Sequence, residues 1–378
     1  MRSAGASREV NARPRLITAL AAVALVAATT VTITVTTAPP ALAYSEQRFV
    51  TKVLDGDTIE IAPPGQTSGP VEVVRFAGVN TNETGMCHAA AATTRTKELI
   101  ENKWITISAD DPASMASDGV RLLRFIDIGN VDVGLTLIEE GLAFALLNDR
   151  EPSRNQLYGE ASKTASLAGE GIWDPDACGV GPGAGTPLRM IVDWDAPGDD
   201  HLPQNRNGEY FRIHNDGASD LSMDGWSIRD SSTHIFSLPT GVEVPAGGYL
   251  TVYGGSGSST STEVYLDHPE PLFNNDVGDA GFLLDPDDDI RVHFSYPCIL
   301  TCSDPLQGKL SVTANWDAEG SDDTNPNGEW IDIRNTSAET VDLFDYTLGN
   351  SFHRYDFPEG STIPPGEILK LYIGSGSN

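Results

Sequence analysis

The chain has 378 residues, of which 54 are acidic and 24 are basic, giving a formal net charge of −30. That sign excludes a basic module that holds nucleic acid mainly by releasing counterions. The length is sufficient for two or three domains. The 37 glycines and 24 prolines, with only 7% aromatic residues, favour short strands joined by many turns.

The N-terminus, residues 1–43, predicts an export signal. Four arginines precede an apolar run over residues 16–35, and Ala41-Leu42-Ala43 supplies the small residues that a signal peptidase requires. An uncleaved membrane anchor is the rival interpretation, because the run approaches spanning length. The cleavage pattern favours removal near Ala43. We therefore expect a secreted, extracellular protein without stable membrane insertion.

Four cysteines fit an oxidising compartment. The pairings Cys87–Cys178 and Cys298–Cys302 keep each bridge within one segment, although four cysteines allow three connectivities. A metal site at Cys298 and Cys302 is the rival interpretation of the second pair. No histidine or third cysteine lies near it in the sequence, which disfavours a metal.

Residues 44–178 mix the strand and helix periodicities. Strands are predicted at 49–54, 59–61, 71–76, 104–107 and 121–128, and helices at 89–102, 133–140 and 151–167. Five short strands with about three helices predict a mainly β domain, a small barrel capped by helices. The glycine-rich residues 179–187 then predict a linker.

The remainder is a tandem repeat with an offset of 119 to 122 residues, seen for Trp194 and Trp316 and for Pro245 and Pro364. Alternating strands separated by Gly, Pro, Asn and Asp turns predict two β-sandwich domains, 188–300 and 308–378. The second copy stops before the counterpart of Thr260 to Pro297. It is therefore expected to be C-terminally incomplete.

Both repeats resemble lamin-tail domains. The resemblance rests on the motif N-G-E-[YW] at 207–210 and 327–330, on a proline-glycine turn before Leu250 or Leu369, and on F-N-N-D-V-G-D at 273–279. It implies immunoglobulin-like sandwiches. It implies little chemistry, because such domains serve many binding contexts, including cell-surface or protein ligands.

Residues 47–175 resemble the staphylococcal nuclease (thermonuclease) family in three blocks that occur in the family's order. The blocks are V-L-D-G-D-T at 53–58, V-R-F-A-G-V-N-T-N-E-T at 74–84 and G-V-R-L-L-R-F-I at 119–126. The resemblance implies an OB-fold-like five-stranded barrel. It also implies a metal-dependent endonuclease that hydrolyses DNA or RNA to 3′-phosphate products.

Three residues match the family's catalytic groups. Arg75 and Arg121 match the two guanidiniums that grip the phosphoryl oxygens, which arginine can do in a bidentate way and lysine cannot. Glu83 matches the carboxylate that orients or deprotonates the attacking water. Each residue alone could be a surface ion-pair or loop residue, and it is their joint order that favours catalysis.

Three further residues match the family's calcium ligands. These are Asp57, Asn80 and the main-chain carbonyl of Thr81, which offer the oxygen atoms that Ca²⁺ prefers. Asn80 stands where the family usually has aspartate, and Asn82 stands in place of a proline.

The family's base-stacking tyrosines also have no aromatic counterparts here. These departures keep open an alternative function. In it the chain is a non-catalytic extracellular binding protein, with a degenerate nuclease fold and lamin-tail adhesion domains.

Overall fold

A computed structural model describes residues 44–378 apart from 197, 233, 299–305, 317–319, 321–324, 350–353, 373 and 375–378. The predicted export signal, residues 1–43, lies outside the described residues. Among the residues that are described, no helix is long and apolar enough to cross a membrane.

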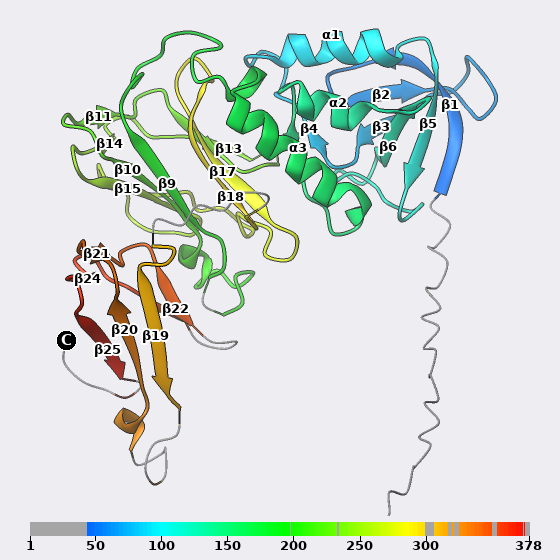
Figure 1. Cartoon of the computed structure of the whole chain (residues 1–378). Helices are drawn as coiled ribbons and strands as arrows, with labels where there is room; N and C mark the ends of the chain where they lie inside the picture. Colours follow the sequence, from blue (N-terminus) through cyan, green and yellow to red (C-terminus); the bar gives the residue numbers. More distant parts are fainter. Residues whose placement is uncertain are drawn as a thin grey trace, which may run out of the picture. The chain divides into compact units, whose positions relative to one another are not determined.

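The N-terminal domain is a closed five-stranded β-barrel, as predicted (Figure 1). Strand β1 pairs with β2 and β5 in antiparallel fashion, β2 pairs with β3, and β5 pairs with β6. A parallel pairing of β3 with β6 closes the ring. The strands of the barrel and its short extension β7 are Tyr44–Val53 (β1), Thr58–Ile61 (β2), Glu72–Phe76 (β3), Trp104–Ala109 (β5), Leu122–Ile128 (β6) and Val131–Asp132 (β7).

Three α-helices pack against the barrel (Figure 1), and their inward-facing side chains complete one apolar core. The Asp132 side chain caps the second helix by accepting a hydrogen bond from Leu135 N. The third helix begins four residues later than predicted, because Pro152 opens a separate 3₁₀ turn. The helices are Ala89–Ile100 (α1), Val133–Glu139 (α2) and Asn155–Ala168 (α3), with 3₁₀ turns at Pro152–Arg154 (η1) and Gly171–Trp173 (η2).

A two-residue strand pair outside the barrel ring places part of the candidate site. Strand β4 (Val79–Asn80) follows β3 directly and pairs with β8 (Phe144–Ala145), so that Asn80 lies opposite Phe144. Gly78 precedes this pair with a φ of 75°, and an added Cβ would lie 2.7 Å from the Tyr158 ring. The sharp turn from β3 into β4 therefore requires glycine.

The first β-sandwich has two four-stranded sheets, β16-β15-β10-β9 and β13-β12-β17-β18, and a small pair β11-β14. Trp226 lies fully buried in the core between them. The strands are Leu188–Asp193 (β9), Tyr210–Asn215 (β10), Leu221–Ser222 (β11), Ser227–Arg229 (β12), Ile235–Ser237 (β13), Glu243–Val244 (β14), Tyr249–Tyr253 (β15), Glu263–Tyr265 (β16), Asp279–Leu284 (β17) and Ile290–Tyr296 (β18), with a 3₁₀ turn at Arg206–Gly208 (η3).

The second β-sandwich repeats the first half of this topology. Its sheets are β19-β20-β25, β21-β24 and β22-β23. Its described residues contain no counterpart of β16, β17 or β18. The elements are Leu310–Asn315 (β19), Pro326–Gly328 (η4), Trp330–Asn335 (β20), Val341–Asp342 (β21), Thr347–Gly349 (β22), Arg354–Asp356 (β23), Thr362–Ile363 (β24) and Ile368–Tyr372 (β25).

The barrel and the first sandwich share an apolar cluster of their own. The Phe144 ring lies 4.8 Å from the Phe282 ring, and Trp173 lies 5.9 Å from Phe282, measured between centroids. The linker prediction for 179–187 suggests separate domains, but these side chains pack as in a single core. The buried members are Phe144, Ala165, Ile172 and Trp173 from the barrel domain and Ala280, Phe282, Leu284 and Ile290 from the sandwich.

Candidate functional site

Asp57 is the central residue of the candidate site. It follows the turn after β1, where Asp55 Oδ1 accepts a hydrogen bond from Asp57 N. Its buried carboxylate accepts hydrogen bonds from Thr81 N at 2.6 Å and Thr81 Oγ1 at 3.0 Å, and from Thr58 Oγ1 at 3.1 Å. The structure thus brings Asp57 and Thr81, predicted from separate sequence blocks, into direct contact.

Arg75 joins the same cluster from strand β3. Its Nη1 lies 2.9 Å from Asp57 Oδ2 and donates to Val79 O, while its Nη2 donates to Asn80 Oδ1 at 2.7 Å. Burial raises the pKa of Asp57, and the positive charge of Arg75 opposes that rise. Burial is the larger of the two effects, so the pKa of Asp57 stays raised, and the ion pair with Arg75 offsets only part of that rise.

Asn80 lies between the barrel and the first sandwich, with only 1% of its surface exposed. Its Oδ1 accepts from Arg75, and its Nδ2 donates to the main-chain carbonyls of Ser231 at 2.9 Å and Ser232 at 2.6 Å. An aspartate here could not donate to those carbonyls. The asparagine that departs from the nuclease pattern is thus the residue that the sandwich contact requires.

Arg121 lies at the edge of the cluster. It is partly exposed, forms an ion pair with Asp118 at 2.6 Å, and reaches Thr58 Oγ1 with its Nη1 at 3.5 Å. Arg124, three residues later, is buried and donates to main-chain carbonyls of a neighbouring loop. The two arginines therefore divide into one that solvent and ligands can reach and one with a structural role.

Glu83 lies outside this hydrogen-bonded cluster. It is exposed, and within the described residues its carboxylate forms no hydrogen bond or ion pair. Its main-chain carbonyl accepts from Met86 N, which tightens the turn that follows. The structure thus joins Asp57, Arg75, Asn80 and Thr81, with Arg121 alongside, and leaves the exposed Glu83 carboxylate outside that cluster.

Sequence reasoning assigned no role to Arg229, and it treated Asn82 only as a missing proline. Asn82 is buried, and its Nδ2 donates to Cys87 O while its Oδ1 accepts from Arg229 Nη1 at 3.0 Å. The loop therefore gains hydrogen bonds in place of proline's rigidity. No local signal could reveal this pair, because its members are 147 positions apart.

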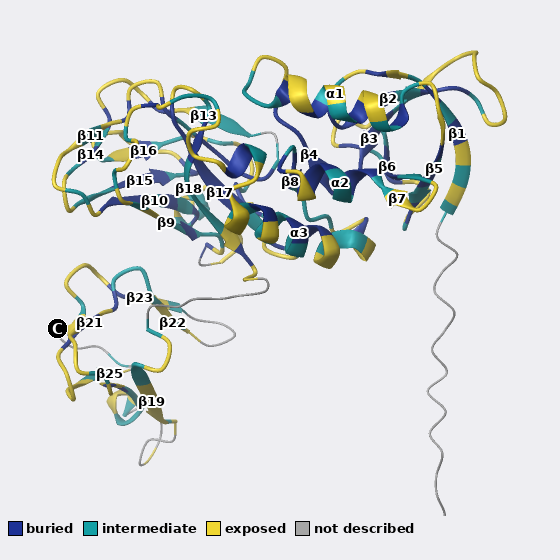
Figure 2. Ribbon diagram, turned by 45° about the horizontal axis from the view of Figure 1, so that its top comes forward, coloured by how far each residue is buried: buried dark blue, intermediate teal, exposed yellow. Residues whose placement is uncertain are grey.

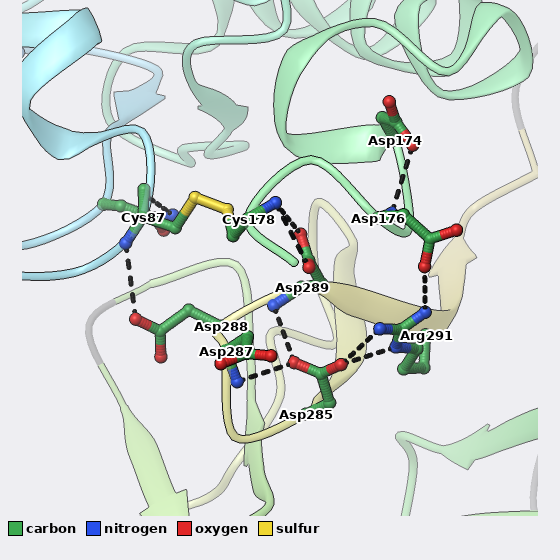
Figure 3. The surroundings of a disulfide bond; sticks show 10 residues. Cys87, Asp174, Asp176, Cys178, Asp285, Asp287, Asp288, Asp289 and Arg291 are labelled. Carbon is green, nitrogen blue, oxygen red and sulfur yellow. Dashed lines mark hydrogen bonds and ion pairs between the residues drawn. A yellow bond between two sulfur atoms is a disulfide. The ribbon is translucent and has the colours of Figure 1, made fainter. Parts of the chain in front are cut away.

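A disulfide closes the other end of this loop (Figure 3). Cys87 and Cys178 are bonded, with Cα atoms 6.1 Å apart, which confirms the predicted pair. Asp288 accepts from Cys87 N, and Asp289 accepts from Cys178 N. Cys298 is also disulfide-bonded, and Cys302, its predicted partner, lies outside the described residues. One turn of the sandwich thus holds both ends of the first bridge.

The donor types in the cluster suit a hard divalent cation, since Asp57, Asn80 and Thr81 all offer oxygen atoms. In this arrangement the Arg75 guanidinium occupies one oxygen of Asp57 and the Oδ1 of Asn80. A cation would therefore take the place that Arg75 now fills. Arg75 can grip a phosphate only when it releases those oxygens.

Comparison with protein-family models finds a match in the two sandwiches. Residues 192–297 and 310–378 match the family model described as Lamin Tail Domain, which confirms that part of the sequence prediction. No nuclease family model matches the barrel. A search of curated proteins finds no match to the chain.

Proposed function

We propose that this chain is a secreted, divalent-metal-dependent phosphodiesterase of the thermonuclease type, which hydrolyses DNA or RNA to 3′-phosphate products. The supporting observation is the cluster in which Asp57, Arg75, Asn80 and Thr81 contact one another, with Arg121 at its edge. These residues come from three separate segments of the barrel. A buried acid, a buried arginine and a reachable arginine at one place are the groups that phosphodiester hydrolysis needs.

In this proposal the two arginines hold the substrate phosphate. Arg75 turns from Asp57 to the phosphoryl oxygens, and Arg121 approaches from the exposed side. A Ca²⁺ ion held by Asp57, Asn80 and the Thr81 carbonyl would neutralise charge on the phosphate. Glu83, on its exposed turn, orients the attacking water or takes its proton. The disulfide and the expected export signal fit action outside the cell.

Hydrolysis of DNA and RNA by the full chain, with Ca²⁺ titrated from zero to millimolar, tests the proposal. Glu83→Gln should lower kcat roughly 100-fold or more, as expected for loss of a general base. Glu98→Gln is the matched control, because Glu98 is an exposed acid on α1 and lies outside the cluster. Equal activity of the wild type and Glu83→Gln would refute the proposed role.

A non-catalytic binding protein is the second candidate function, and one observation favours it. Asn80 donates to Ser231 and Ser232 of the sandwich, so its amide serves a domain contact. If the wild type is inactive, Asn80→Asp becomes the informative variant, because it restores the family's carboxylate. Gain of calcium-dependent hydrolysis would identify metal binding as the missing step. Continued inactivity would favour a binding role, with the lamin-tail domains contacting a cell-surface or protein ligand.

A further inference from the structure

Arg229 is a buried arginine that the first lamin-tail domain extends to the barrel. It ends strand β12, and only 1% of its surface is exposed. Its Nη1 donates to Asn82 Oδ1 at 3.0 Å, and its Nη2 and Nε donate to the carbonyls of Ser232 and Asp230. Its guanidinium lies over the Phe144 ring, 4.3 Å from the centroid. One side chain thus contacts both strand β8 and the loop after β4.

The charge of Arg229 is compensated from both domains. Burial lowers its pKa to about 10, while the negative charges of Asp230, Glu83 and Asp279 favour the protonated form. The side chain therefore stays protonated at neutral pH. The carboxylate of Glu83, which forms no hydrogen bond among the described residues, is linked to the sandwich through this attraction.

We propose that Arg229 is a positioning residue for the barrel's candidate site, which it serves by fixing the loop from Thr81 to Glu83 through Asn82. Thr81 precedes the anchored residue and contacts Asp57, while Glu83 follows it. The same anchor thus holds the carbonyl expected to bind the cation and the carboxylate expected to act on water. This role rests on the function proposed above, but the anchoring itself does not.

Lysine cannot replace Arg229 in this role. The guanidinium spreads its donors over Asn82, Ser232 and Asp230 in one plane and stacks on Phe144. A lysine ammonium is a compact point charge without that planar fork. The lamin-tail domain is therefore expected to be part of the site's support, and its removal should loosen the loop even in an intact barrel.

The test compares full-length wild type, Arg229→Lys, Arg229→Met and Asn82→Ala. Amide hydrogen exchange of residues 80–86 should speed up at least 10-fold in all three variants, because each one removes the guanidinium or the amide that forms the Arg229–Asn82 hydrogen bond. Arg206→Met is the matched control, since among the described residues Arg206 donates hydrogen bonds only within the sandwich, to the carbonyls of His201 and His268. It should leave exchange in 80–86 unchanged.

Kinetics and a double variant complete the test. Arg229→Lys should lower kcat about 10-fold and leave KM nearly unchanged, because Arg75 and Arg121 still hold the phosphate. Arg229→Met with Asn82→Ala should loosen residues 80–86 no more than either change alone.

Unchanged exchange in residues 80–86, or additive effects in the double variant, would overturn the proposal. An equal fall in kcat and rise in KM would also count against positioning of Glu83. If the wild type shows no hydrolysis, the proposed function fails, while hydrogen exchange still decides whether Arg229 anchors the loop.

Discussion

The two lamin-tail domains share local structure and differ in what covers it. Asn215 and its counterpart Asn335 are both fully buried, and each donates from Nδ2 to two main-chain carbonyls. In each case Oδ1 accepts from the main-chain N–H two residues later, that of Gly217 or Ser337. A turn set by neighbouring residues thus forms the same way in both copies.

The two domains differ in the exposure of the residues that strands β17 and β18 cover in the first domain. Met190, on β9, is 3% exposed, whereas Val312, at the same place on β19, is 56% exposed. Figure 2 shows the same contrast, with buried strands in the first sandwich and mostly intermediate or exposed residues in the second. The repeated motif therefore specifies a half-sandwich, and a complete core needs the second half of the repeat.

The largest expected contrast concerns the aromatic residue after the β11 or β21 strand. Trp226→Ala removes a fully buried side chain and should lower the free energy of opening of β10 by about 3–5 kcal/mol. Tyr346→Ala changes a half-buried side chain and should cost β20 only about 1 kcal/mol. Amide hydrogen exchange of the two strands in the full chain measures both values. Equal losses would mean that the two cores are equally packed.

A second contrast concerns the glutamate of the N-G-E motif. Glu209 is fully buried and accepts from Leu272 N and Phe273 N. Burial raises its pKa to about 7, despite these donors, and the charges of Asp200 and Asp279 add to the rise. Within the described residues, the carboxylate of Glu329 accepts no hydrogen bond, and these residues contain no counterpart of the segment around Leu272.

This raised pKa gives a pH dependence with a definite sign. Below pH 4.5, the ordinary pKa, Glu209 is protonated whether the domain is open or closed, and its contribution is complete. Between pH 4.5 and 7 the open domain releases this proton while the closed domain keeps it, so stability is lost as the pH rises toward the raised pKa of about 7. The difference in opening free energy between the wild type and Glu209→Gln should change by about 3 kcal/mol from pH 4.5 to 7.

In the difference between wild type and Glu209→Gln, the contributions of the other buried acids to the pH dependence cancel. These acids, including Asp279, are present in both proteins. The matched comparison is between wild type and Glu329→Gln, with the opening free energy of β20 measured against pH. For these two proteins the curves of opening free energy should run parallel. Parallel curves for Glu209→Gln in β10 as well would show that Glu209 does not carry the pH dependence.

Much of the fold follows from local patterns. The strand at 71–76 and the helix at 89–102 were predicted within two residues of β3 and α1, since alternation and helical runs are local signals. The packing of Phe144 on Phe282 was not predicted, because an apolar residue does not reveal its distant partner. Interdomain contacts depend on tertiary structure that a pattern search does not contain.

The candidate site likewise contains residues that local motifs predict and residues whose roles depend on contacts between domains. Asp57, Arg75 and Thr81 lie in motifs with recognisable spacing, and the structure brings them into contact. The roles of Asn80 and Asn82 became visible only with the sandwich in place, because their partners are Ser231, Ser232 and Arg229. Read in isolation, both asparagines are departures from a family pattern. In the fold they are the polar contacts between two domains.

The smallest contrast isolates strand β18 itself. Trp194 stacks on Tyr296 with ring centroids 4.3 Å apart and an interplanar angle of 11°. Its counterpart Trp316 is 82% exposed. Trp194→Ala should therefore cost about 2 kcal/mol of opening free energy in β9, from lost burial and stacking. Trp316→Ala should change that of β19 by less than about 0.5 kcal/mol.

Hydrogen exchange of β9 and β19 tests this pair directly, and Tyr296→Ala serves as its control. Because Trp194 stacks on Tyr296, loss of either ring should remove most of the same stabilisation, and the double variant should cost less than the sum. If Trp316→Ala costs as much as Trp194→Ala, something covers Trp316 in solution as β18 covers Trp194. The second half-sandwich would then be a surface that another strand fills, and the contrast between the two domains would disappear.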